Sequence, residues 1–226
     1  MAQILKTGSI ILRTGQSIFI TGQIPVPVLD LDGENLIGTP GSAISLWPEA
    51  GGNNAFQTTA ISQPLIETVG GKKCVRFDGV NDFLFLTVPV VAKTAFFVVE
   101  SLGANTDFTP LVSGTSGDVS EMAYFDGHGE NWFRHFGGLF GTSATDRLFT
   151  NGTRVSPPSA QPKLTVRHLL CLDVSLVVNI SRLVNRSVGG GTSINMRMYR
   201  LVIYNKRLTD IERSAVTQQL RTLYAI

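Results

Sequence analysis

Apolar residues in this chain gather in short runs, and glycine, proline, asparagine and aspartate separate the runs. Strand-like runs lie over 75–77, 83–86 and 95–99, and the segment 196–204 alternates between apolar and other residues. The alternation predicts that five side chains share one face of a strand: Met196, Met198, Arg200, Val202 and Tyr204. Short runs divided by turn residues are typical of β-sandwiches and barrels.

One segment near the end of the sequence has a helical pattern. The Thr209 hydroxyl can cap a helix, and Glu212 three residues later completes a capping box. Apolar residues at helical spacing then predict the packed face, which contains Ile211, Ala215, Leu220, Leu223 and Tyr224. We expect this helix to dock for packing only.

The first 27 residues differ from the rest. They carry two charged side chains, Lys6 and Arg13, and a Thr-Gly pair recurs every seven residues. Between these pairs lie β-forming residues, among them Ile10, Ile11, Leu12, Ile18, Phe19 and Ile20. Pro25 and Pro27 then favour an extended connector. The pattern predicts a β-arm over 1–27 and a folded domain over 28–226.

An arm this apolar needs a surface that covers it, because disordered segments are poor in isoleucine, valine and phenylalanine. It either adds strands to its own domain or lies on a neighbouring molecule, and the sequence leaves both arrangements open. Intersubunit contact would make the protein a homo-oligomer or a component of a larger assembly.

The charge content favours a surface that faces other protein. Charged residues make up 16% of the chain, against about 25% in ordinary soluble domains. The alternative is a monomer coated with serine and threonine. A net charge of +2 gives no case for nucleic acid as a partner.

Neither a membrane span nor a disulfide framework is expected. No apolar run approaches the roughly 20 residues that a membrane helix needs, and the first residues lack the apolar core of a secretory signal. Cys74 and Cys171 lie in separate strand-like runs. We expect both to be buried thiols, with a bridge as the minor alternative.

Three stretches carry a resemblance to a known family. They are residues 45–57, with Trp47 before a Gly/Asn-rich loop, residues 63–84, and residues 202–224. Together they resemble LamG-like modules of the concanavalin A-like lectin/glucanase superfamily, of the phage and bacterial surface-protein type. The resemblance implies an all-β fold, a two-sheet antiparallel jelly-roll sandwich with one C-terminal helix and, here, an N-terminal β-arm. No cofactor is implied beyond calcium, which many members use.

Four residues in the second stretch predict a structural turn. They are Asp78, Gly79, Asn81 and Asp82. Glycine supplies a positive φ, and the carboxylate and amide side chains can accept hydrogen bonds from turn amides. A metal or sugar site is the alternative. Trp47 is expected to be a core residue at a strand end rather than a platform for sugar.

The glucanase catalytic pattern is absent. Retaining glucanases of this superfamily use Glu-x-Asp-x-x-Glu on one strand, so that two carboxyl groups flank the glycosidic bond. No glutamate here is followed two residues later by aspartate. On this basis the chain is expected not to be an enzyme.

The densest group of reactive side chains lies over 126–135. It contains Asp126, His128, Glu130, Trp132 and His135. Alternation would place the two acids and His128 on one side of an extended segment, but three such groups alone do not make a metal site. A glycan-binding or contact loop and a plain connector are the other two interpretations.

These features predict a non-enzymatic structural protein of a virion, assembled in the host cytoplasm. It would be a capsid decoration (cement) or tail-associated protein whose arm attaches to other virion proteins or to copies of itself. The alternative is a carbohydrate-binding module that recognises a cell-surface glycan, with Trp132 stacking on a sugar ring.

Overall fold

The computed structural model describes residues 24–103, 109–114, 121–126, 132–134, 147–155, 165–184 and 194–226. These residues form thirteen strands, two short 3₁₀ helices and one α-helix. In chain order the elements are β1 (Leu29–Asp32), η1 (Gly33–Asn35), β2 (Leu46–Trp47), β3 (Ala55–Phe56), η2 (Ala60–Ser62), β4 (Leu65–Val69), β5 (Lys72–Asp78), β6 (Leu84–Ser101), β7 (Thr109–Ser113), β8 (Glu121–Asp126), β9 (Trp132–Arg134), β10 (Arg147–Thr150), β11 (Thr153–Val155), β12 (His168–Leu183), β13 (Asn195–Tyr204) and α1 (Asp210–Tyr224).

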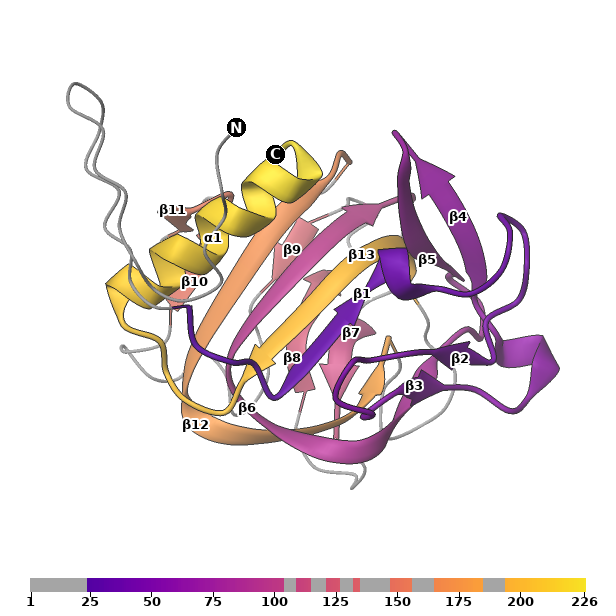
Figure 1. Cartoon of the computed structure of the whole chain (residues 1–226), viewed down its shortest axis with the longest axis horizontal. Coiled ribbons are helices and arrows are strands. Elements are labelled where there is room, and N and C mark those ends of the chain that lie inside the picture. Colours follow the sequence, from indigo (N-terminus) through magenta and orange to yellow (C-terminus); the bar gives the residue numbers. More distant parts are fainter. Residues whose placement is uncertain are drawn as a thin grey trace, which may run out of the picture.

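The described strands pair in one antiparallel sheet, and this confirms the predicted mostly-β class with a single C-terminal helix. The main path runs β4-β5-β13-β6-β12-β7-β8-β9. Five strands lie off this path: β1 pairs with β13, β10 joins β12 to β11, and β3 joins β6 to β2. Figure 1 shows α1 crossing one face of the sheet.

The network is continuous because β6 and β12 are long enough to change partners along their length. The first part of β6 pairs with β3, and its last part pairs with β13. The first part of β12 pairs with β10, and its end pairs with β7. The two strands also pair with each other along most of their length, across two register shifts. Figure 1 shows both strands curving at the lower side of the molecule.

Alternation along these strands divides the apolar side chains between two clusters. In β6, Ala95, Phe97 and Val99 belong to the larger cluster. Phe96 and Val98 belong to a smaller cluster, which lies on the other face and includes residues of α1. Since side chains alternate between the faces of a strand, this part of β6 is buried on both sides and is accordingly apolar throughout.

A β-bulge overturns the predicted face of β13. The register against β6 shifts between Met198 and Arg200. Met196 and Met198 therefore face the larger cluster, whereas Val202 and Tyr204 face the smaller one. The extra residue is Tyr199, which also faces the smaller cluster. A bulge inserts one residue and reverses the parity of those that follow.

The capping box of α1 is confirmed, but the predicted apolar stripe is partly wrong. The Thr209 hydroxyl accepts a hydrogen bond from the Glu212 amide at 3.2 Å, and the Glu212 carboxylate accepts one from the Thr209 amide at 2.8 Å. Ile211 is 50% exposed and Leu223 37%. The buried residues are Val216, Thr217, Leu220 and Tyr224, because the helix presents this face to the sheet. In the described part of the chain, no helix is long and apolar enough to span a membrane.

Trp47 and the two cysteines are buried, as predicted. Trp47 has no exposed surface, and its indole Nε1 donates to the Asp32 carbonyl at 2.8 Å. Cys74 and Cys171 are free thiols in the cluster beneath α1. Burial raises the pKa of the Cys74 thiol to about 12 and raises that of Cys171 as well, so neither is suited to nucleophilic chemistry.

Candidate functional site

The predicted reactive loop lies largely outside the described residues, and so does the arm sequence through residue 23. Asp126 ends β8, Trp132 begins β9, and the two residues are backbone partners in that pair of strands. His128, Glu130 and His135 are not among the residues that the structure describes. The same holds for Ile10, Ile11, Leu12, Ile18, Phe19 and Ile20.

The residues of the predicted turn lie together between β5 and β6. The Asp78 carboxylate accepts hydrogen bonds from the amides of Val80 at 2.7 Å and Asn81 at 3.3 Å. The Asp82 carboxylate accepts from the Asp78 amide at 2.9 Å. Gly79 has φ +82°, a conformation that favours glycine. In the described residues, no three His, Cys, Asp or Glu side chains are grouped to hold a metal ion.

A separate feature, which the sequence did not single out, is an open pocket between α1 and the β10–β11 turn. Its volume is about 590 Å³. Side chains with hydroxyl, amide and guanidinium groups dominate its lining: Asn151, Gly152, Thr153, Arg213, Ser214, Thr217, Gln218, Arg221, Thr222 and Ile226. None of the lining side chains is a carboxylate. We call this feature the α1 pocket.

The β10–β11 turn fits closely against the helix. Asn151 and Gly152 both have positive φ, at +49° and +88°. The Asn151 side chain accepts from the Leu169 amide at 2.9 Å, which ties the turn to β12. A Cβ atom on Gly152 would lie 3.1 Å from the Thr217 methyl carbon. Asparagine and glycine at this turn therefore set the distance between the two walls of the pocket.

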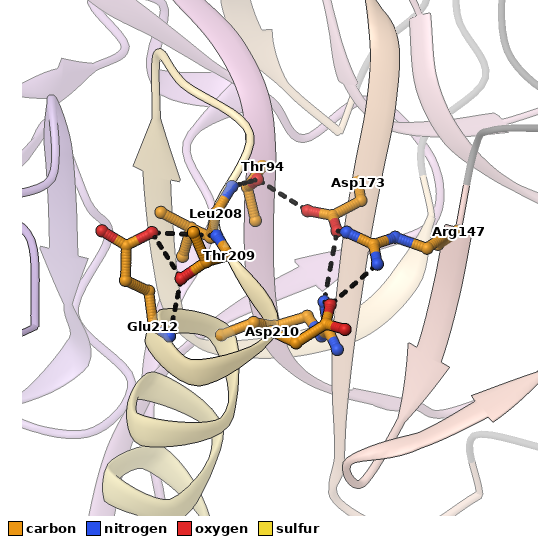
Figure 2. Close-up of polar contacts among 8 residues, drawn as sticks. Thr94, Arg147, Asp173, Leu208, Thr209, Asp210 and Glu212 are labelled. Carbon is orange, nitrogen blue, oxygen red and sulfur yellow. Dashed lines mark hydrogen bonds and ion pairs between the residues drawn. The ribbon is translucent and has the colours of Figure 1, made fainter. Parts of the chain in front are cut away.

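A buried carboxylate fixes the start of α1 (Figure 2). Asp173 in β12 has no exposed surface. It accepts a hydrogen bond of 2.6 Å from the Thr94 hydroxyl, and Arg147 Nη2 donates to it at 2.6 Å. The Thr94 hydroxyl in turn accepts from the Leu208 amide at 3.1 Å, just before the helix. The network thus joins β6, β10 and β12 to the segment that leads into α1.

Two arginines extend this network to the surface of the helix. Arg147 Nη1 donates to Asp210 at 2.8 Å, and Arg213 donates to Asp210 at 2.6 Å. Arg213 also lies 3.6 Å from the Asp173 carboxylate. Its guanidinium carbon is 4.0 Å from the centre of the Phe149 ring, a cation–π distance. Arg213 is therefore held from several sides where it lines the α1 pocket.

The α1 pocket is suited to a ligand that is rich in hydroxyl groups. Hydroxyl and amide side chains both donate and accept hydrogen bonds, and guanidinium groups donate several. Ser214, Gln218 and Thr222 are all exposed, and they lie four residues apart on α1, so they project from the same side of the helix. These groups can hold a ligand by several hydrogen bonds at once.

Comparison with known proteins finds likeness in structure only. No protein-family model matches the chain, and no curated protein matches its sequence. Solved structures of the Trypanosoma rangeli sialidase are similar. The complex with 2,3-difluoro-KDN has 15% identity and a TM-score of 0.53, and the complex with sialic acid has 13% and 0.51. Each match covers 88% of this chain and 34% of the sialidase, so the chain spans about a third of the length of these proteins. At this identity, the likeness shows the fold.

The comparison corrects the expectation that the chain is not an enzyme. The proteins with a similar fold are sialidases, which are enzymes. The missing Glu-x-Asp-x-x-Glu pattern excludes only the arrangement of glucanases, in which two carboxyl groups lie on one strand. Other glycosidases place their reactive groups differently, since sialidases use a tyrosine nucleophile. The absence of this one motif therefore does not exclude enzymatic activity.

We expect Asp173→Ala to lower the free energy of unfolding by about 3 kcal/mol or more, because it leaves the half-buried Arg147 without its buried partner. Asp210→Ala serves as the control. Asp210 is exposed and binds the same arginines, and we expect a much smaller effect. Urea unfolding followed by circular dichroism measures both. Equal effects of the two substitutions would contradict the role of Asp173 as the anchor of α1.

A second prediction concerns Asp82, whose burial raises the pKa of its carboxyl group to about 6. The folded protein thus holds this proton more tightly than the unfolded chain, where the pKa is about 4. The resulting stabilisation is complete below pH 4 and is lost as the pH rises through 6. Asp82→Asn keeps an acceptor for the Asp78 amide but removes the titration.

Relative to the Asp82→Asn variant, the wild type should lose about 1 kcal/mol of stability between pH 4 and pH 7. The rise of the Asp82 pKa from about 4 to about 6 sets an upper limit of about 3 kcal/mol on this loss. Urea unfolding at a series of pH values checks this difference. If the difference in the free energy of unfolding between the two proteins does not change with pH, Asp82 has an ordinary pKa.

Proposed function

We propose that this chain is a carbohydrate-binding module and that the α1 pocket is its glycan site. The observation that carries the proposal is the lining of the pocket. Hydroxyl, amide and guanidinium groups from α1 and from the β10–β11 turn converge on one open space of about 590 Å³. A sugar unit presents several hydroxyl groups at fixed angles, and a set of fixed donors and acceptors gives it orientation and specificity.

The positions of these groups are set by the fold. Arg213 is fixed by Asp173, Asp210 and the Phe149 ring. Thr217 is nearly buried against the Gly152 turn. Gln218 and Thr222 remain exposed and free to adapt to a ligand. The fixed donors lose little entropy when a ligand binds, whereas ordering Gln218 and Thr222 has an entropic cost.

The family interpretation belongs to the same proposal. We take the continuous sheet to be the jelly roll of a LamG-like module, supported by the order of the three matching stretches in the sequence. One similar structure is a sialidase in complex with sialic acid, so sialylated glycans are among the first ligands to test. Since this chain spans about a third of that protein, hydrolysis of sialosides is tested separately.

Binding is best measured by a glycan array followed by titration of the strongest ligand. We expect Gln218→Ala to weaken binding about five- to tenfold, the effect of about one lost hydrogen bond. Gln219→Ala is the matched control, because Gln219 is exposed on the same helix but does not line the pocket. Release of a fluorescent group from a sialoside is measured in parallel.

Three results would overturn the glycan-binding proposal or change it. Absence of binding on a broad array contradicts it outright. An equal loss of glycan affinity in Gln218→Ala and Gln219→Ala would show that the α1 pocket is not the binding site. Turnover of the sialoside would show that the chain is a hydrolase rather than a binding module.

We also propose that residues 1–27 attach the module to a virion, through other virion proteins or further copies of this chain. One structural observation favours an arm that leaves the domain. The Val28 amide donates to the Ile203 carbonyl at 2.8 Å, next to the start of β1. Two residues earlier, Val26 is 90% exposed among the described residues. The apolar sequence before it needs a surface that covers it, and a neighbouring molecule can supply one.

Deletion of residues 1–25 tests the attachment. We expect the shortened chain to keep its cooperative thermal transition and its glycan binding, because β1 and all later elements are retained. Its association with particles, or with itself in sedimentation, should be lost. Undiminished association of the shortened chain would show that the arm is not the attachment segment.

A further inference from the structure

A row of side chains, apolar except for one arginine, crosses four strands on the face opposite the larger cluster. Leu46 in β2 pairs with Phe56 in β3, Phe56 pairs with Phe85 in β6, and Phe85 pairs with Arg182 in β12. Partners in neighbouring strands lie on the same face. We call these four residues, together with Phe83, the aromatic row.

The row is on the outside of the sheet. Leu84 and Leu86, which flank Phe85, are buried in the larger cluster, so alternation turns Phe85 to the other face. Leu46 is 46% exposed, and Phe56, Phe83 and Phe85 are each half-buried.

The rings of the row contact one another. The Phe83 and Phe85 ring centres are 5.0 Å apart with the rings at 84°, and those of Phe56 and Phe85 are 5.9 Å apart. These are favourable aromatic geometries. The rings therefore form a fixed surface.

Arg182 ends the row with a charge that nothing in the described structure neutralises. Its guanidinium carbon lies 5.1 Å from the centre of the Phe85 ring. Its Nε atom is buried and has no hydrogen-bond partner, and no ion pair of Arg182 is found among the described residues. The half-buried Arg147, Arg197 and Arg200 differ, since each binds at least one carboxylate.

The combination favours one class of ligand. A guanidinium group that has no carboxylate partner among the described residues attracts an anion, and carboxylate and sulfate groups match its planar arrangement of donors. The ring faces beside it offer an apolar surface on which the carbon face of a sugar ring can pack. We infer that the aromatic row binds an acidic saccharide, with the sugar ring on Phe56 and Phe85 and its negative group on Arg182.

This inference rests on the proposed function in one respect, since it assumes that the chain binds glycans. It adds a second site, which shares no residue with the α1 pocket. That pocket is built from α1 and the β10–β11 turn, whereas the row belongs to β2, β3, β6 and β12 and the residue that precedes β6. Substitutions in the two sites can therefore be compared in the same protein.

The experiment is a calorimetric titration of the full chain with three oligosaccharides of equal length. One contains uronic acid, one is sulfated, and one is neutral. We expect the two acidic compounds to bind more tightly than the neutral one, and the tighter of them identifies the preferred anion. Arg182→Gln should weaken acidic binding about tenfold or more, remove most of its dependence on salt, and leave neutral binding unchanged.

Two control variants separate charge from folding, and a third variant tests the contribution of the rings. Arg182→Lys keeps the charge and should retain part of the acidic preference, and its thermal midpoint shows whether the fold tolerates the change. Arg154→Gln removes an exposed arginine of β11, outside the row, and should leave acidic binding intact. Phe56→Leu keeps an apolar side chain but removes the ring. It should weaken the binding of every compound whose sugar ring packs on Phe56.

The outcomes distinguish this inference from the proposed function. Glycan binding that depends on Gln218 but not on Arg182 leaves the function standing and overturns the acidic site. Equal affinity for acidic and neutral compounds would also overturn the acidic site and leave the proposed function standing. Self-association that Arg182→Gln or Phe56→Leu abolishes would make the row an interface between copies of this chain and would also overturn it.

Discussion

The arrangement of the helix on the sheet depends on one buried charge. Asp173 has no exposed surface, and a buried carboxylate is costly unless charged and hydrogen-bonding groups surround it. Thr94, Arg147 and Arg213 supply these groups from three other parts of the chain. The Thr94 hydroxyl also accepts a hydrogen bond from the Leu208 amide. The need to surround Asp173 with polar groups therefore also determines where α1 begins and where the polar residues of its surface lie.

Features set by neighbouring residues could be predicted from the sequence. The Thr209–Glu212 capping box and the hydrogen bonds within the Asp78 turn join residues at most four positions apart, so the residue types alone carry the signal. The burial of Trp47 and the mostly-β class followed from the same local patterns. The interpretation of Asp126 and Trp132 as binding residues stays a prediction.

Features set by strand register could not be predicted. The partners of Asp173 lie 79, 26 and 40 residues away, and the aromatic row joins residues whose alignment exists only once four strands have paired. A single extra residue, Tyr199, reversed the expected faces of β13. The α1 pocket likewise needs the turn at Gly152 to meet Thr217, and its residues form no motif along the chain.

The length of β6 and β12 has a consequence for the molecule as a whole. Each is an unbroken stretch of backbone that belongs to both ends of the sheet. No hinge or boundary therefore separates the end that carries α1 from the end that carries β2 and β3. We therefore expect the two ends to lose their structure together rather than one at a time.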